Sequence, residues 1–178
     1  MYRPGHIGVT LLVYAPVGYL LLIGGRGTFA VLGGTIAVAL AMVPDFDIRL
    51  PGVSHRGATH TLVFALCVGA VLGAIGWVLA GAVGGATVTL GEGLGVRTNR
   101  ISPIGLGAFA FLVGTLTICS HLLADVLTPM GIAPFWPVSS KRYSLDVAKA
   151  SSTIANGLLF ALGVCATLGV LWIVRPAG

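Results

Sequence analysis

The sequence predicts an all-α fold, a polytopic membrane bundle of about five transmembrane or membrane-embedded helices, and three observations lead to it. Of the 178 residues, 56% are hydrophobic and only 8% are charged, whereas a soluble domain carries roughly a quarter charged residues. The mean hydropathy is +1.01. The apolar residues are grouped in five long segments. We therefore expect residues 1–178 to form a single integral membrane domain.

The five apolar segments are expected to be helices that cross the membrane in alternating directions. They run over His6–Ile23, Thr28–Val43, Thr59–Val83, Ile104–Leu127 and Thr153–Val174. The second is short, because a span needs at least about 17 residues, so the predicted topology depends most on it. Gly69 and Gly73 have the GxxxG spacing that lets membrane helices pack closely.

Alternation of these helices places three segments on the side of the membrane that holds the N-terminus, here called side A. They are Met1–Gly5, Pro44–Ala58 and Pro129–Ser152. Six of the ten basic residues lie on side A, and basic residues are enriched in cytoplasmic loops. We therefore expect a protein of the cell membrane with side A in the cytoplasm. The net charge of +5 reflects a shortage of acids, and no basic run predicts a nucleic-acid partner.

All four histidines of the chain and three of its five acids fall on or near side A. They are His6, Asp45, Asp47, His55, His60, His121 and Asp125. Random scatter between the two faces would rarely produce this arrangement. An ionisable side chain in an apolar membrane segment is costly, so it usually has a partner and a function.

The spacing of these residues is typical of a metal site. His121 and Asp125 are four residues apart on a predicted helix, which brings their Cβ atoms within about 5–6 Å of each other. Asp45 and Asp47 follow Pro44, where a helix must end. Imidazole and carboxylate ligands suit zinc, or manganese if water completes the coordination. The sequence therefore predicts one or two divalent metal ions, with zinc preferred over manganese.

Each candidate residue has an expected role. The predicted metal ligands are His6, Asp45, Asp47, His60, His121 and Asp125. Asp47 is also a candidate general base. His55 is a candidate metal ligand, or a general acid that protonates the leaving group. Arg56 is a candidate to bind phosphate through the paired N–H groups of its guanidinium. Thr59 and Thr128 are candidates to orient the metal ligands through hydrogen bonds.

Metal-free alternatives remain for these residues. A hydrogen bond between His121 and Asp125 would satisfy both side chains inside a helical core. Asp45 and Asp47 could instead form ion pairs with Arg49 and Arg56.

The same residues resemble a known family. The segments are Pro44-Asp45-Phe46-Asp47, His55-Arg56-Gly57-Ala58-Thr59-His60 and His121-x-x-x-Asp125-x-x-Thr128-x-x-Gly131. They resemble the signature of the YdjM-like membrane-bound metal-dependent hydrolases, and His6 fits that pattern. The resemblance covers the chain from His6 to about Pro137, and it implies an activity class without a substrate.

A looser likeness is to the zinc-dependent phospholipase C and P1 nuclease group. The order His6, Asp45 or Asp47, His60, His121 and Asp125 is similar to the order of ligands in that group. That group has further histidine and acidic ligands downstream, whereas here only Asp146 remains after Asp125. One or two metal ions are therefore expected, and a three-metal cluster is not.

These observations together predict a metal-dependent hydrolase at the membrane surface. The expected substrate is a small-molecule or lipid phosphoester, the expected partner is membrane lipid, and no motif sets the oligomeric state. One alternative is a metal-ion or proton transporter, which would need polar groups along a path across the membrane. Another is a non-catalytic protein whose polar cluster joins helices. The apolar segments are nearly free of ionisable residues away from side A, which favours the hydrolase.

Overall fold

The structure is a computed structural model, and it describes residues 1–49, 51–52, 54–82 and 102–175. Its α-helices are α1 Arg3–Ile23, α2 Gly27–Leu40, α3 Leu62–Ala82, α4 Pro103–Val126 and α5 Thr153–Val174. Two short 3₁₀-helices, η1 Pro44–Arg49 and η2 Ala58–His60, lie between α2 and α3. Five helices are long and apolar enough to cross a membrane when α2 is counted together with η1. The predicted helical membrane bundle is confirmed.

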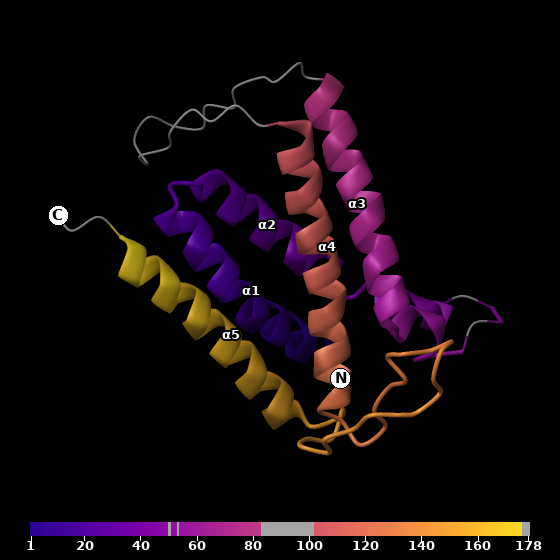
Figure 1. Cartoon of the computed structure of the whole chain (residues 1–178). Coiled ribbons are helices and arrows are strands. Elements are labelled where there is room, and N and C mark those ends of the chain that lie inside the picture. Colours follow the sequence, from indigo (N-terminus) through magenta and orange to yellow (C-terminus); the bar gives the residue numbers. More distant parts are fainter. Residues whose placement is uncertain (50, 53, 83–101, 176–178) are drawn as a thin grey trace.

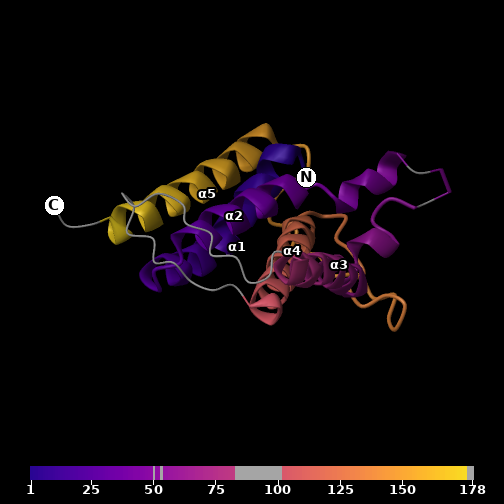
Figure 2. The same cartoon turned by 90° about the horizontal axis from the view of Figure 1, so that it is seen from above.

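The helices are arranged as two groups that meet at α4. Helix α3 packs along α4, α5 packs along α1, and α1 and α2 both contact α4. Figure 2 shows α1, α2 and α5 on one side and the α3–α4 pair on the other. The N-terminus and the segments that join α2 to α3 and α4 to α5 lie at one end of the bundle, and the C-terminal end of α5 lies at the other (Figure 1). This arrangement agrees with the predicted alternation around side A.

Helix α2 ends earlier than the predicted segment Thr28–Val43. The α-helix has 14 residues, which corresponds to about 21 Å and is less than the roughly 30 Å of a bilayer core. Tighter turns follow it, since Ala41 N–H donates to Val38 O and Val43 N–H donates to Leu40 O. Pro44 explains the change, because a proline disfavours helical geometry at the residue before it. The chain then enters η1 and carries Asp45 and Asp47 to side A.

Helix α3 begins at Leu62 and not at Thr59, where the apolar pattern begins. Thr61 is extended, with φ −126° and ψ 157°, and its Oγ accepts a hydrogen bond of 3.1 Å from the N–H of Phe64. This is the geometry of a helix N-cap. His60 therefore sits on η2, just outside the membrane helix. The predicted end of this segment, Val83, lies outside the described residues.

Glycine contacts hold α3 close to α4. A Cβ atom at Gly69 would overlap Thr115 Oγ1 and the Phe111 carbonyl, and one at Gly73 would come within 3.1 Å of Gly107 O. The GxxxG pair therefore packs against α4, in the way such pairs pack in membranes. This close packing sets the distance between the N-terminus of α3, which follows His60, and the side-A end of α4.

The segment Thr128–Ser152, called the strap below, crosses the side-A end of the bundle. The N–H groups of Leu145 and Val147 donate to the Val126 and Leu127 carbonyls at 2.7 and 2.9 Å. Ile132 and Tyr143 exchange two backbone hydrogen bonds of 3.1 and 2.8 Å. The N–H of Leu62 also donates to Pro134 O at 2.9 Å. The strap is thus fastened by its backbone to both α4 and α3.

Candidate metal centre

The residues predicted to form the site meet at the side-A end of the bundle. His6 comes from the first turns of α1, Asp45 and Asp47 from η1, His60 from η2, and His121 and Asp125 from the last turns of α4. His55 and Arg56 lie in the turn before η2. The structure brings all eight together, although they are spread over 120 positions of sequence. Most are fully buried, and the Asp45 side chain remains 16% exposed.

Four atoms form the centre of this cluster: His60 Nε2, His121 Nε2, Asp45 Oδ1 and Asp125 Oδ2. His60 Nε2 lies 3.4 Å from Asp45 Oδ1 and 3.3 Å from Asp125 Oδ2. His121 Nε2 lies 3.4 Å from Asp45 Oδ1 and 3.5 Å from Asp125 Oδ2. The two Nε2 atoms are 3.3 Å apart. Zinc bonds of about 2.0–2.1 Å in tetrahedral geometry place neighbouring ligand atoms roughly 3.3–3.4 Å apart, so these spacings fit one zinc ion.

The other ring nitrogens of His121 and His60 determine what the Nε2 atoms can do. His121 Nδ1 lies 2.7 Å from Ala41 O, which only accepts, so Nδ1 carries the hydrogen. Thr59 Oγ1 donates to Asp47 Oδ2 at 2.8 Å, so its oxygen is left to accept from His60 Nδ1 at 3.0 Å. In neutral rings, both Nε2 atoms therefore present lone pairs.

The lone pairs of the two Nε2 atoms and the two carboxylate oxygens thus face one another. These four groups are all electron donors, and a cation between them would satisfy them. Asp125 Oδ2 is buried and has no hydrogen-bond partner among the described residues. Burial lowers the pKa of His60, but the carboxylates of Asp125 and Asp45 outweigh burial and raise it above its usual value. Without a metal ion, a proton on His60 would supply the positive charge that these carboxylates favour. A divalent metal ion, to which the donor atoms are suited, would take the place of that proton.

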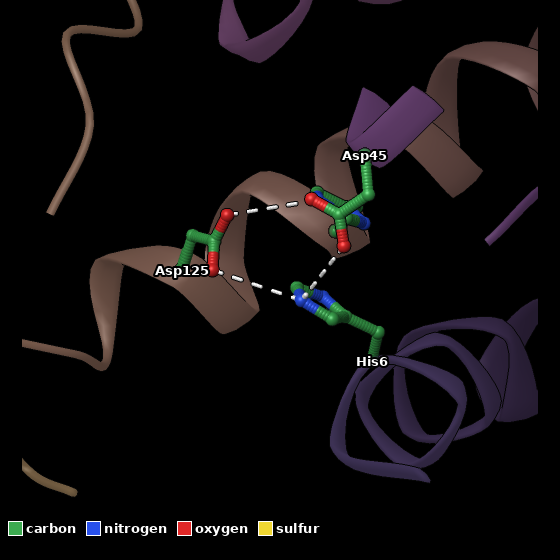
Figure 3. A group of neighbouring side chains, drawn as sticks. His6, Asp45 and Asp125 are labelled. Carbon is green, nitrogen blue, oxygen red and sulfur yellow. Dashed lines mark ion pairs between the residues drawn. The ribbon is translucent and has the colours of Figure 1, made fainter. Parts of the chain in front are cut away.

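His6 approaches the same two carboxylates from another direction. Its Nε2 lies 3.8 Å from Asp45 Oδ2 and 3.7 Å from Asp125 Oδ1, and Figure 3 shows both ion pairs. Its ring stacks on His121, with centroids 3.8 Å apart and planes at 6°. Neither ring nitrogen has a hydrogen-bond partner among the described residues. Asp45 and Asp125 thus direct one oxygen to the four-atom centre and the other to His6. The ligand atoms of His6, Asp45, His121 and Asp125 also lie within 4.8 Å of one another, so these four residues form an alternative set that could hold a metal ion.

Asp47 lies behind His60 and is not one of the four central atoms. Its Oδ2 is 3.4 Å from His60 Nδ1 and accepts from Thr59 and from the Arg56 N–H at 3.1 Å. Its Oδ1 lies 2.9 Å from His55 Nδ1. A carboxylate behind a ligating histidine fixes the orientation of the ring and increases its basicity. This geometry favours a role for Asp47 in holding His60 and His55.

The Asp47→Asn variant is expected to bind zinc about 10–100-fold more weakly, because it weakens the support behind His60. Competition with a chelator of known affinity measures the change in the purified protein. Asp146→Asn is the matched control, since Asp146 is exposed on the strap and takes part in none of the ion pairs among the described residues. Equal zinc affinity of Asp47→Asn and Asp146→Asn would contradict the supporting role.

Arg56 pairs with a different acid from the one expected. Its Nη2 donates to Asp125 Oδ1 at 2.7 Å, and its Nη1 donates to Thr128 Oγ1 at 3.1 Å. Only its backbone N–H reaches Asp47. Asp125 Oδ1 also pairs with the Met1 amino group at 3.2 Å. The Arg56 guanidinium therefore already compensates the oxygen that a metal ion beside His6 would use.

The comparison with protein families agrees with the motifs. The family model for the YdjM inner membrane protein matches residues 1–176. The chain belongs to this family. The match confirms the YdjM-like resemblance and extends it beyond Pro137. No curated protein and no solved structure matches the chain significantly, and the looser likeness to phospholipase C and P1 nuclease is not shown.

Membership of the YdjM family and the five apolar helices make this an integral membrane protein. One contact of the candidate site in this YdjM protein had no signal in the sequence. The Ala41 carbonyl orients His121, and any residue type could supply that oxygen. Arg142 is a second such case, because it reaches the Gly131 carbonyl beside Arg56, and its place in the strap gave no indication of that neighbour.

Proposed function

We propose that this protein is a membrane-bound metal-dependent hydrolase that cleaves a phosphoester, such as a lipid headgroup, at the membrane surface. The observation that carries the proposal is the set of four central atoms, because five of their six mutual distances are 3.3–3.5 Å, the spacing expected of ligands around a tetrahedral zinc ion. His60, His121, Asp45 and Asp125 would hold this ion. Zinc is the preferred metal and manganese the second choice.

The surrounding residues fit a hydrolytic reaction. A bound divalent ion would supply a Lewis acid that polarises the ester and acidifies water. His55 is 40% exposed at its side chain and is held through Nδ1 by Asp47. Its other ring nitrogen can therefore exchange a proton with solvent or with a leaving group. Arg56, already bonded to Asp125, supplies positive charge beside the ligands.

The exposed apolar residues of side A support a substrate in the membrane. Phe46 and Ile48 on η1 and Met130 on the strap are more than half exposed, and Val138 is 92% exposed. Basic residues accompany them, including Arg49, whose guanidinium lies 5.4 Å from the Phe46 ring centroid. Apolar and basic side chains together are typical of a surface that lies in the headgroup layer. We place this surface at the cytoplasmic leaflet.

The interior beyond the site supports a hydrolase over a transporter. Thr10 and Ser120 form the next polar layer, with their hydroxyl oxygens 2.8 Å apart. Farther along α4, the Thr117 hydroxyl is satisfied by the Val113 carbonyl. Among the described residues, the carboxylates and imidazoles all lie at the side-A end. A transporter needs polar access from both sides, and the described helices provide it from one.

Hydrolysis and metal flux can be measured on the same full-length protein. The zinc-loaded protein in detergent is expected to release phosphate or alcohol from phosphoester substrates. A chelator should abolish the activity, and added zinc should restore it. The His60→Ala variant should fall to the uncatalysed rate, while Asp146→Asn should stay active. Zinc uptake into sealed vesicles containing the protein, with no hydrolysis of any ester, would favour the transporter.

A further inference from the structure

We infer that a pocket beside the metal centre binds the terminal phosphate of a phosphomonoester lipid. The pocket has a volume of about 550 Å³ and lies between the strap and the turn that precedes η2. Its polar side chains are Ser54, Arg56, Ser140 and Arg142, and Trp136 forms part of the wall. The described residues that line it include no carboxylate. The inference rests on the proposed function only for the hydrolysis that would follow binding.

Two guanidinium groups converge at this pocket. Arg56 Nη1 donates to Gly131 O at 3.3 Å, and Arg142 Nη1 lies 3.4 Å from the same oxygen. Like charges held this close repel each other unless an anion lies near them. Asp125 compensates Arg56 from the side of the metal centre. The ion pairs among the described residues give Arg142 no carboxylate partner.

Arg56 is the buried arginine of the pocket, and its side chain is held by the surrounding protein. It is only 6% exposed, and its buried Nε has no hydrogen-bond partner among the described residues. An unpaired buried donor is costly, and more so when it is charged. Arg56 also has φ +59°, a conformation that non-glycine residues adopt rarely and often at functional sites. An anion in the pocket would compensate the charge of Arg56 at short range without contacting Nε, which is shielded from solvent.

The backbone of the strap fixes the position of Arg142. The paired residues Ile132 and Tyr143 flank the turn, so Arg142 is held beside Gly131. Gly131 has φ +56°, and a Cβ atom there would overlap the Tyr143 carbonyl. Only glycine allows this close approach. The two arginines are therefore positioned before any ligand binds, which reduces the cost of ordering them on binding.

The charge and position of the pocket indicate the class of anion. A terminal phosphate carries close to two negative charges and three acceptor oxygens, which match two guanidinium groups and the hydroxyls of Ser54 and Ser140. A phosphodiester carries one charge. Trp136 is 48% exposed at the pocket wall, and tryptophan prefers the headgroup region. Because Arg56 contacts both the pocket and Asp125, a phosphate there would lie next to the metal ligands.

Native mass spectrometry of the full-length, zinc-loaded protein in detergent can count retained lipids. The probes are phosphatidic acid, a phosphomonoester, and the diesters phosphatidylglycerol and phosphatidylcholine. We expect selective retention of phosphatidic acid and a loss of about 10–100-fold in affinity for it in Arg142→Ala, which removes a charge-assisted bond. Lys149→Ala is the matched control, because it removes the same charge from an exposed position of the strap outside the pocket. Unchanged zinc content shows that each variant is folded.

The outcomes separate this inference from the proposed hydrolase. Selective retention of phosphatidic acid that depends on Arg142, without hydrolysis of any ester, would support the phosphate pocket and overturn the proposed hydrolase. Equal retention by the protein and Arg142→Ala, equal loss in Lys149→Ala, or equal retention of all three lipids would overturn the pocket, whatever the hydrolysis assay shows. Displacement of phosphatidic acid by an equal concentration of inorganic phosphate would support the same chemistry with free phosphate as its source.

Discussion

The His121→Ala variant is expected to lose most of the bound metal. His121 Nε2 is one of four atoms that surround the proposed ion, and its lone pair is directed there by the bond from Nδ1 to Ala41 O. The chain has only four histidines, so a replacement ligand is scarce. We expect a fall in zinc affinity of more than about a hundredfold, because even changes behind a ligand cost 10–100-fold. Elemental analysis after dialysis measures the change.

The His55→Ala variant is the comparison for this experiment. His55 is part of the same cluster, but its side chain is 40% exposed and its Nδ1 is held by Asp47. We therefore expect this variant to retain most of its zinc. The thermal unfolding of both variants shows whether the bundle remains intact. Full zinc content in a folded His121→Ala protein would remove His121 from the ligand set, and a metal-free His121–Asp125 pair would then be the better description.

The helices and the face that carries the site could be predicted from the sequence for a physical reason. In lipid, a spanning segment must be apolar over a minimum length, so hydropathy alone locates α1, α3, α4 and α5. Charges are then confined to the ends, and alternation of the spans determines which ends meet. His6 and His121 are 115 residues apart, yet their rings stack, because both lie at the same end of antiparallel neighbours.

The details of the site depended on backbone geometry that hydropathy does not encode. Thr61 caps α3 and leaves His60 on η2, although the apolar pattern begins at Thr59. Asp45 and Asp47 are separated by one residue, and the 3₁₀ turn sends one to the central atoms and the other behind His60. Arg56 reaches Asp125 on α4 and not the nearby Asp47, because its backbone at φ +59° sets where the side chain begins.

Arg56→Ala is expected to destabilise the metal-free protein strongly. The guanidinium is buried, donates to Asp125 Oδ1 at 2.7 Å and also bonds Thr128 and Gly131. Removing one partner of a buried ion pair leaves the other charge uncompensated, which typically costs about 3–5 kcal/mol. Thermal and denaturant unfolding in detergent measure the loss. Arg142→Ala is the matched control, because it removes an arginine from the same pocket without breaking an ion pair, and its stability should change little.

Zinc should recover much of the stability that Arg56→Ala loses. Without the guanidinium, the carboxylates of Asp45 and Asp125 have less positive charge near them, so the affinity for a divalent cation should rise. A ligand that binds the folded state more tightly stabilises it more. The increase in unfolding temperature on adding zinc should therefore be larger in Arg56→Ala than in Arg142→Ala. An equal increase in both variants would show that Asp125 is not shared between Arg56 and the metal ion. Unchanged stability of metal-free Arg56→Ala would show that the ion pair is not formed.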